Sequence, residues 1–167
     1  MKLHIQTSHT EQAVPRILHI EQDGRLFRFH LRHATLGQRY PGRNWCKFRE
    51  HAHDVYHIVL YTGGADELLL GDTRHPVGRG SLALIQPGDW HDVAARRTEG
   101  IVYSEVTFDF LDPDGAPLLM PFHELVSVVA GMPLEPAPMP AVLSEAQTRR
   151  FEADFERLLG WLEELHP

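Results

Sequence analysis

The sequence predicts an all-β fold, an antiparallel sandwich or barrel, followed by C-terminal amphipathic helices. Between residues 25 and 110, short stretches of alternating apolar and polar residues are separated by turn signals at intervals of roughly 8–12 residues. The turns are marked by Gly63-Gly64, Gly71-Asp72 and Pro87-Gly88. No strand–helix–strand alternation interrupts the series, which argues against a parallel α/β sheet.

The alternation places individual strands along the chain. We expect them at residues 25–33, 45–49, 55–62, 67–70, 74–77, 81–85, 90–94 and 101–110. In the last of these, Glu105 has the opposite parity to the apolar Val106 and Phe108, so we expect no obvious acid or base among the inward positions.

The pattern changes to helical spacing in the last third of the chain. We expect a helix at 122–130, a stiff linker rich in proline, and a second helix opened by the capping pair Ser144 and Gln147. Its apolar stripe comprises Phe151, Phe155, Leu158, Leu159, Leu162 and Leu165. We therefore divide the chain into a barrel at 1–118 and a helical tail at 119–167. The stripe can be buried on the barrel or in a homodimer interface, and both interpretations stay open.

Composition excludes several classes of partner. The formal net charge is −7, and clustered Lys and Arg that would neutralise phosphates are scarce, so we expect no nucleic-acid contact by this chain alone. No apolar run approaches the roughly 20 residues that span a bilayer, and the N-terminus carries no apolar signal region, so we expect no membrane association. A single cysteine, Cys46, rules out an internal disulfide and predicts a cytoplasmic location.

Histidines are concentrated in one stretch. His51, His53 and His57 are spaced at i, i+2 and i+6, and on a β-strand all three side chains would point to one face. His91 follows the Pro87-Gly88 turn. Four imidazoles gathered in this way suit a divalent transition metal such as Zn, Ni, Fe or Cu. The alternative is that these histidines line a polar pocket without a metal.

The same residues carry a family resemblance. His51-Ala52-His53, then His57, and Gly80 followed by Gln86-Pro87-Gly88 and His91 resemble the two cupin motifs, HxHxxxE and GxxxxxPxGxxH. The resemblance implies a double-stranded, jelly-roll-like β-barrel. The chain departs from the motif by placing His57 where cupins have glutamate and Gln86 where they have proline.

Within the cupins, the chain resembles the N-terminal domain of AraC-type transcription regulators. The shared strings are HAHDVYHIVLYTGG, GRGSLALIQPGDWHDV and VTFDFLDPDG. The resemblance implies a ligand-sensing and dimerisation domain that binds a small polar molecule, such as a saccharide, and dimerises through the C-terminal helix. The family's DNA-binding helix-turn-helix domain is not found in these 167 residues.

An organic ligand would lie in the barrel mouth. Trp45 and Trp90 are the candidate stacking surfaces, and Arg49 and Gln86 are the candidate hydrogen-bonding residues. A competing interpretation is a stand-alone metal-dependent cupin enzyme, a dioxygenase or isomerase, in which the four histidines hold the ion. A third interpretation, a purely structural dimerisation module, predicts a barrel filled by side chains.

Overall fold

The computed structural model describes residues 2–5, 16–40, 50–96 and 100–164. Antiparallel strands dominate these residues, and two helices follow near the C-terminal end. In chain order the elements are β1 (Lys2–Ile5), β2 (Arg16–Gln22), β3 (Arg25–Arg39), β4 (Tyr56–Gly63), β5 (Ala65–Leu70), β6 (Thr73–Gly78), β7 (Ser81–Ile85), β8 (His91–Asp92), β9 (Val102–Leu111), α1 (Phe122–Ala130), β10 (Ala141–Val142) and α2 (Glu145–Glu164).

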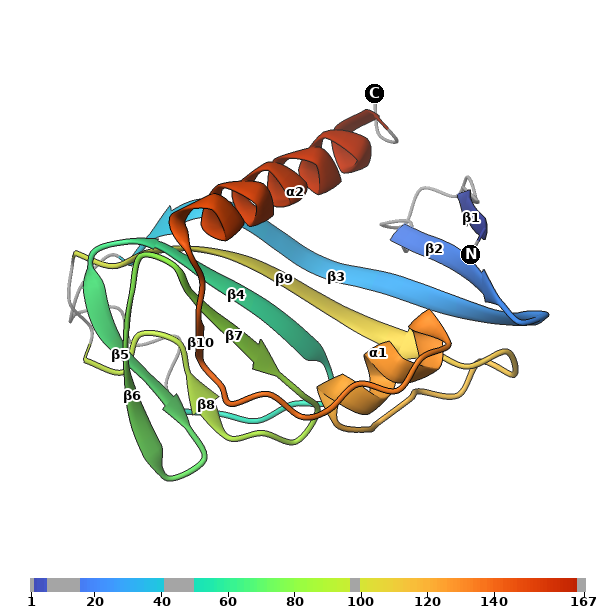
Figure 1. Cartoon of the computed structure of the whole chain (residues 1–167), viewed down its shortest axis with the longest axis horizontal. Helices are drawn as coiled ribbons and strands as arrows, with labels where there is room; N and C mark the ends of the chain where they lie inside the picture. Colours follow the sequence, from blue (N-terminus) through green and yellow to red (C-terminus); the bar gives the residue numbers. More distant parts are fainter. Residues whose placement is uncertain (1, 6–15, 41–49, 97–99, 165–167) are drawn as a thin grey trace.

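The strands form two sheets that face each other (Figure 1). The larger sheet has the order β1-β2-β3-β9-β4-β7-β10, and the smaller has the order β6-β5-β8. The apolar cluster between them joins Val59 and Tyr61 of β4 and Ile85 of β7 to Leu68 of β5 and Val77 of β6. This cluster is the interior of the barrel, and it fixes the small sheet over the central strands of the large one.

Strand β4 shows how the sequence specifies two opposite faces. His57, Val59 and Tyr61 point between the two sheets, whereas Ile58 and Leu60 belong to a second apolar cluster on the other face. Period-two alternation sends successive side chains to opposite sides of the strand. Both sides are buried here because each belongs to an apolar cluster. The strand therefore links the barrel interior to the outer layer.

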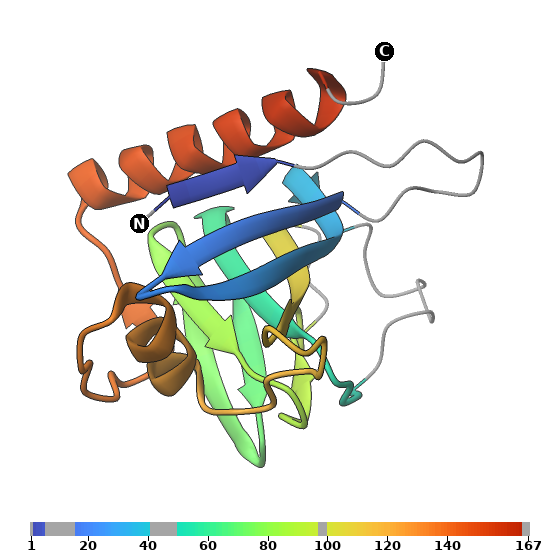
Figure 2. The same cartoon turned by 90° about the vertical axis from the view of Figure 1, so that its right-hand side faces the viewer.

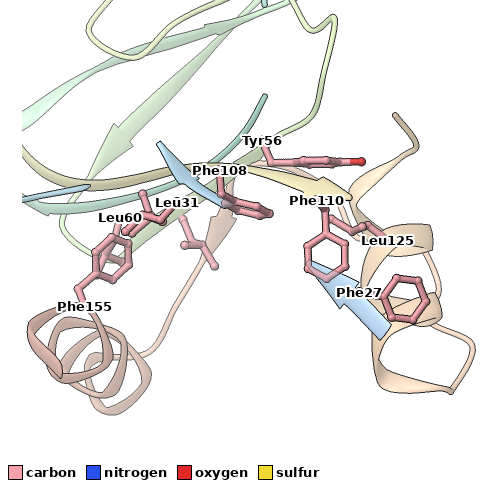
Figure 3. Packing of buried hydrophobic residues seen from close by; sticks show 10 residues of the cluster. Phe27, Leu31, Tyr56, Leu60, Phe108, Phe110, Leu125 and Phe155 are labelled. Atoms are coloured by element: carbon pink, nitrogen blue, oxygen red, sulfur yellow. The ribbon is translucent and has the colours of Figure 1, made fainter. Parts of the chain in front are cut away.

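The outer layer consists of the two helices, which pack on the face of the large sheet that is turned away from the barrel. Figure 2 shows α2 along one end of this sheet and α1 beside the turn between β2 and β3. In Figure 3, Phe155 of α2 lies near Leu31 and Leu60, and Leu125 of α1 lies near Phe27. The described part of the apolar stripe, which comprises Phe151, Phe155, Leu158 and Leu159, thus packs on the chain's own sheet.

This packing predicts a large stability loss when Phe155 is shortened. Phe155 is only 5% exposed, so Phe155→Ala removes a buried ring and leaves a cavity. We expect the free energy of unfolding to fall by about 3 kcal/mol, measured by urea denaturation. Glu156→Ala, on the exposed side of the same helix, should change it by less than about 0.5 kcal/mol. Equal effects of the two variants would contradict the packing of α2 on the sheet.

Most predicted elements are confirmed, and the differences have local causes. The helix at 122–130 and the strand at 81–85 have the predicted bounds, and Ser144 and Gln147 exchange the hydrogen bonds of a capping box. The sequence does not predict strands β1, β2 and β10. Residues 16–22 of β2 lack clean alternation, and β10 has only two residues. The strand predicted at 45–49 lies outside the described residues. Among the described residues, neither helix is long and apolar enough to cross a membrane.

Candidate metal centre and ligand cavity

One end of the barrel interior is open, and its walls form a cavity of about 1430 Å³. The walls come from β3, from residues 50–57, from the segment that begins at His91, and from the inner face of β9. This volume exceeds the roughly 300–1,000 Å³ of ordinary ligand pockets. The side chains of the described residues therefore do not fill the barrel at this end, in contrast to what a purely structural module would require.

Three imidazoles meet inside this cavity. One ring nitrogen from each of His51, His53 and His91 lies within 4.8 Å of the other two. The backbones of His51 and His91 hold the group together through two hydrogen bonds, His51 N to His91 O at 3.1 Å and His91 N to His51 O at 2.9 Å. Gly88 N donates to the His53 carbonyl at 3.0 Å, so the Pro87-Gly88 turn is joined to the same segment.

This arrangement corrects one part of the sequence prediction. Strand β4 begins at Tyr56, so His51 and His53 precede the strand that carries His57. His51 forms an isolated bridge with His91 instead of continuing the ladder. The histidines converge because this bridge holds His51 beside His91, and a single strand face does not account for it.

His91 offers the clearest metal-binding atom. The residue is 1% exposed, and Nδ1 lies 2.8 Å from the Asp89 carbonyl, which can only accept, so Nδ1 carries a proton. The lone pair is then on Nε2, which has no hydrogen-bond partner among the described residues. A buried polar atom without a partner costs free energy, and an ion at Nε2 would remove that cost.

His57 extends the cluster toward β9. Its Nε2 lies 2.9 Å from Nε2 of His53, and its Nδ1 lies 2.5 Å from Oε1 of Glu105. Two nitrogens bound to one ion at roughly 2.0–2.1 Å lie about 3 Å apart, so the separation of the two Nε2 atoms suits a shared cation. His57 lies next to the three converging imidazoles, in contact with His53, and Glu105 lies on its far side.

Burial favours the neutral forms of His53 and His91. The pKa of His91 is lowered to about 4, mainly by burial; the hydrogen bond to Asp89 opposes this shift and the neighbouring imidazoles add to it. Burial, together with His57 and His51, also lowers the pKa of His53. Burial alone would raise the pKa of Glu105, but its hydrogen bond and charge interaction with His57 bring it below the ordinary value. The neutral imidazoles of His53 and His91, with the ionised Glu105 in the same cavity, favour a divalent cation.

The lowered pKa of His91 predicts acid sensitivity of the metal-free protein. Below its ordinary pKa of 6.5, the unfolded chain binds a proton that the folded chain does not, so stability falls as the pH drops from 6.5 towards about 4. The loss from this one group reaches about 3 kcal/mol. Urea denaturation of chelator-treated protein between pH 7 and 4 measures it. His91→Asn should flatten this slope, and an unchanged slope would contradict the assignment.

Glu105 corrects a second prediction. Its parity is opposite to that of Val106 and Phe108, as the sequence indicates, but those apolar residues face the helices. Glu105 consequently faces the barrel interior and lines the cavity together with Tyr103 and Thr107. The inner face of β9 does contain a carboxylate, in contrast to our expectation.

The predicted ligand-binding residues have different positions. Trp45 and Arg49 lie outside the described residues. Gln86 does not line the cavity, and its Oε1 accepts a hydrogen bond from Phe122 N at the start of α1. Trp90 is 49% exposed and does not line the cavity either. The structure therefore gives no support to Gln86 or Trp90 as a ligand-binding residue.

Sequence reasoning did not find the cavity wall formed by β3. Arg32, His33 and Thr35 line the cavity, while Leu31 and Ala34 pack on the opposite face. The register between β3 and β9 shifts between Leu31 and His33, so the alternation changes phase there. The only sequence signal for this wall is a break in the alternation: residues 27, 29 and 31 are apolar, but residue 33 is a histidine.

The chain is similar to several solved structures at low sequence identity. A cupin 2 conserved barrel domain protein from Salinispora arenicola CNS-205 is 19% identical, with 64% of this chain and 74% of that chain covered and a TM-score of 0.32. A cupin 2 conserved barrel domain protein from Rhodopseudomonas palustris is 18% identical over 78% and 90%, with a TM-score of 0.33. A double-stranded beta-helix domain protein from Klebsiella pneumoniae is 16% identical over 67% and 82%, with a TM-score of 0.32.

The family assignment comes from the sequence. No curated protein matches the chain. The model of the AraC-like ligand binding domain matches residues 35–166, which include the cluster of imidazoles, most of the cavity walls and both helices. The fold is the predicted cupin barrel with C-terminal helices, and the chain belongs to the family of AraC-like ligand binding domains.

Proposed function

We propose that this chain is the sensing domain of an AraC-type transcription regulator and that it binds its small-molecule ligand beside a metal ion. The observation that carries the proposal is the convergence of His51, His53 and His91 inside the cavity, with the unpartnered Nε2 of His91 among them. His57 adds a fourth nitrogen next to His53. The family assignment supports the sensing role, and the donor atoms support the metal.

The donor set restricts the choice of ion. All the converging groups are imidazole nitrogens, and imidazole suits Zn, Ni, Fe and Cu better than the oxygen-seeking Mg or Ca. An ion held by three or four nitrogens on one side of an open cavity keeps coordination positions for a ligand oxygen. Small polar molecules with vicinal hydroxyls, saccharides among them, suit such a site.

Strand β4 provides a route from the cavity to the helical tail. His57 points into the cavity, and Leu60, three residues along the same strand, packs in the cluster that contains Phe155 of α2. A ligand that fixes His57 would favour one packing of α2 over another, provided that it binds the two arrangements unequally. The proposed output of the sensor is DNA recognition, together with a contact between two copies of the chain.

A dimer cannot use the buried part of the apolar stripe unless α2 leaves the sheet. Phe151, Phe155, Leu158 and Leu159 all pack in the outer cluster. The exposed side of α2 is charged, and it includes Arg149, Arg150 and Glu156. We therefore expect the homodimer to form through this polar side, or through α2 after ligand binding has loosened it.

A thermal-shift screen tests the sensing role. The metal-loaded chain is mixed with a panel of pentoses, hexoses and their acids, and the melting temperature is compared with that of chelator-treated protein. We expect at least one compound to raise the melting temperature only when the ion is present, because its oxygen atoms bind the ion. The absence of any shift with saccharides, or equal shifts with and without metal, would contradict a metal-assisted saccharide sensor.

One observation favours the enzyme as a second candidate. Oε1 of Glu105 lies 2.5 Å from Nδ1 of His57 within the cavity, so the inward positions do include an acid or base. The test is oxygen uptake by the Fe(II)-loaded protein in the presence of compounds that raise its melting temperature. Turnover of any of them would favour the dioxygenase interpretation, whereas binding without turnover favours the sensor.

A further inference from the structure

We propose that Glu105 is a positioning residue for the metal centre and that it acts through His57. By accepting the proton of His57 Nδ1, Glu105 directs the Nε2 lone pair of His57 at the ion, so that His57 becomes its fourth nitrogen ligand. The inference rests on the metal centre proposed above. It adds a residue from a strand that contributes none of the four histidines.

The contact geometry carries the proposal. The His57 ring has one nitrogen facing each neighbour, with Nδ1 2.5 Å from Oε1 of Glu105 and Nε2 2.9 Å from Nε2 of His53. A carboxylate only accepts hydrogen bonds, so a proton lies on Nδ1, and in the neutral ring that binds a metal the lone pair is then on Nε2. Histidines that bind metals almost always donate their other ring N–H to a carboxylate, a carbonyl or water, and this fixes the tautomer and the ring orientation. His91 has the same arrangement, with the Asp89 carbonyl as its acceptor.

The strand register makes this pair rigid. His57 of β4 lies opposite Thr107 of β9, and Val59 lies opposite Glu105. Glu105 and His57 are therefore diagonal neighbours on the inner face of two paired strands, a separation that long side chains span. Their side chains are only 14% and 7% exposed, so water competes little for the hydrogen bond. A rigid, shielded pair can hold a ligand in place before the ion arrives.

The pair also explains how the chain can tolerate its departure from the cupin motif. The motif places a glutamate where this chain has His57. The replacement of that glutamate by histidine removes one negative charge from the site. Glu105 returns a carboxylate to the site from β9, separated from the ion by one imidazole. The carboxylate increases the electron donation of that imidazole and balances part of the charge of a divalent ion. The ordinary alternative is that Glu105 merely satisfies a buried histidine and has no effect on metal binding.

A double-mutant cycle separates these two roles. The four proteins are the unchanged chain, Glu105→Ala, His57→Ala and the double variant, and the measured quantity is Zn²⁺ affinity by competition with a chromophoric chelator. We expect Glu105→Ala to weaken binding about 100-fold, near the upper end of the effect of such outer partners. In the His57→Ala background, Glu105→Ala should change the affinity by less than about twofold, because its route to the ion is already gone.

Two further variants separate orientation from charge. Glu105→Gln keeps an oxygen that accepts the Nδ1 proton but loses the charge, so we expect a loss of about 10-fold. Glu50→Gln removes one charge from the cavity rim and should change the affinity by less than about twofold. The visible spectrum of the Co²⁺-loaded protein gives a second readout, because loss of the fourth nitrogen in Glu105→Ala changes the ligand field.

The outcomes are distinct. Unchanged Zn²⁺ affinity and an unchanged Co²⁺ spectrum in Glu105→Ala would overturn the positioning role while leaving the metal centre intact. An equal loss in the presence and absence of His57 would overturn the action through His57. If Glu105→Ala does not fold, the comparison of Glu105→Gln with Glu50→Gln decides instead, and equal affinities of these two variants overturn the proposal. An unchanged chain that binds no ion contradicts the proposed metal centre itself.

Discussion

Replacing His53 by alanine should abolish metal binding. The His53 ring is central in the group, with its centroid 5.1 Å from that of His51, 4.5 Å from that of His57 and 5.0 Å from that of His91. Its loss removes one ligand and leaves a gap between the others. We expect the affinity for Zn²⁺ or Ni²⁺ to fall by more than the roughly 10–100-fold that loss of an outer partner costs. Isothermal titration of chelator-treated protein measures it.

The same variant should lose the stabilisation that comes from the metal. An ion at 100 times its dissociation constant stabilises a folded chain by about 2.7 kcal/mol, and we expect this gain to disappear in His53→Ala. His75→Ala is the matched control, because His75 lies on β6 and does not line the cavity. If His75→Ala and His53→Ala lost metal binding equally, the ion would not be held by the cluster in the cavity.

Gly64→Ala should destabilise the fold more than any other single methyl addition considered for the turns. Gly64 connects β4 to β5 with φ of 73°, and a Cβ atom there would lie 1.6 Å from the carbonyl oxygen of Gly100. The left-handed backbone alone costs an alanine about 1–2 kcal/mol. The overlap is with backbone atoms, which cannot rotate away, so we expect a total loss of at least about 4 kcal/mol or failure to fold.

Gly71→Ala is the control for Gly64→Ala. Gly71 also has positive φ, at 58°, but no atom lies within 4 Å of the position that its Cβ would occupy. We expect it to cost only the backbone term, about 1 kcal/mol. Circular dichroism during urea denaturation compares the two variants. Similar losses in both would mean that the close approach of Gly64 to Gly100 does not determine the effect.

The sequence predicts the barrel well because its signals are local. Turn residues and alternation define the strands from β4 to β9 within a few residues, since each turn requires particular backbone angles and each strand has two different faces. Strand β2 was missed because its apolar residues, Ile17, Leu18 and Ile20, do not alternate. Its place in the sheet comes from pairing with β3, which is a non-local interaction.

The candidate site is less readable from the sequence, because both faces of the central strands are buried. Alternation in β9 separates Glu105 from Val106, but it does not say which face is the barrel interior. The apolar residues face the helices, so the rule that apolar means inward gives the wrong side. The four histidines could be named from their spacing, but the partnership of His57 with Glu105 depends on the register between β4 and β9.

Elemental analysis of the purified, untagged chain tests the central claim most directly. We predict about one equivalent of Zn, Ni, Fe or Cu per chain, and loss of that metal in His53→Ala prepared in parallel. A substoichiometric amount of all four metals in both proteins, which incubation with each ion does not raise, would contradict the metal centre. The cavity would then be a pocket for an organic ligand alone, with its histidines serving as hydrogen-bonding groups.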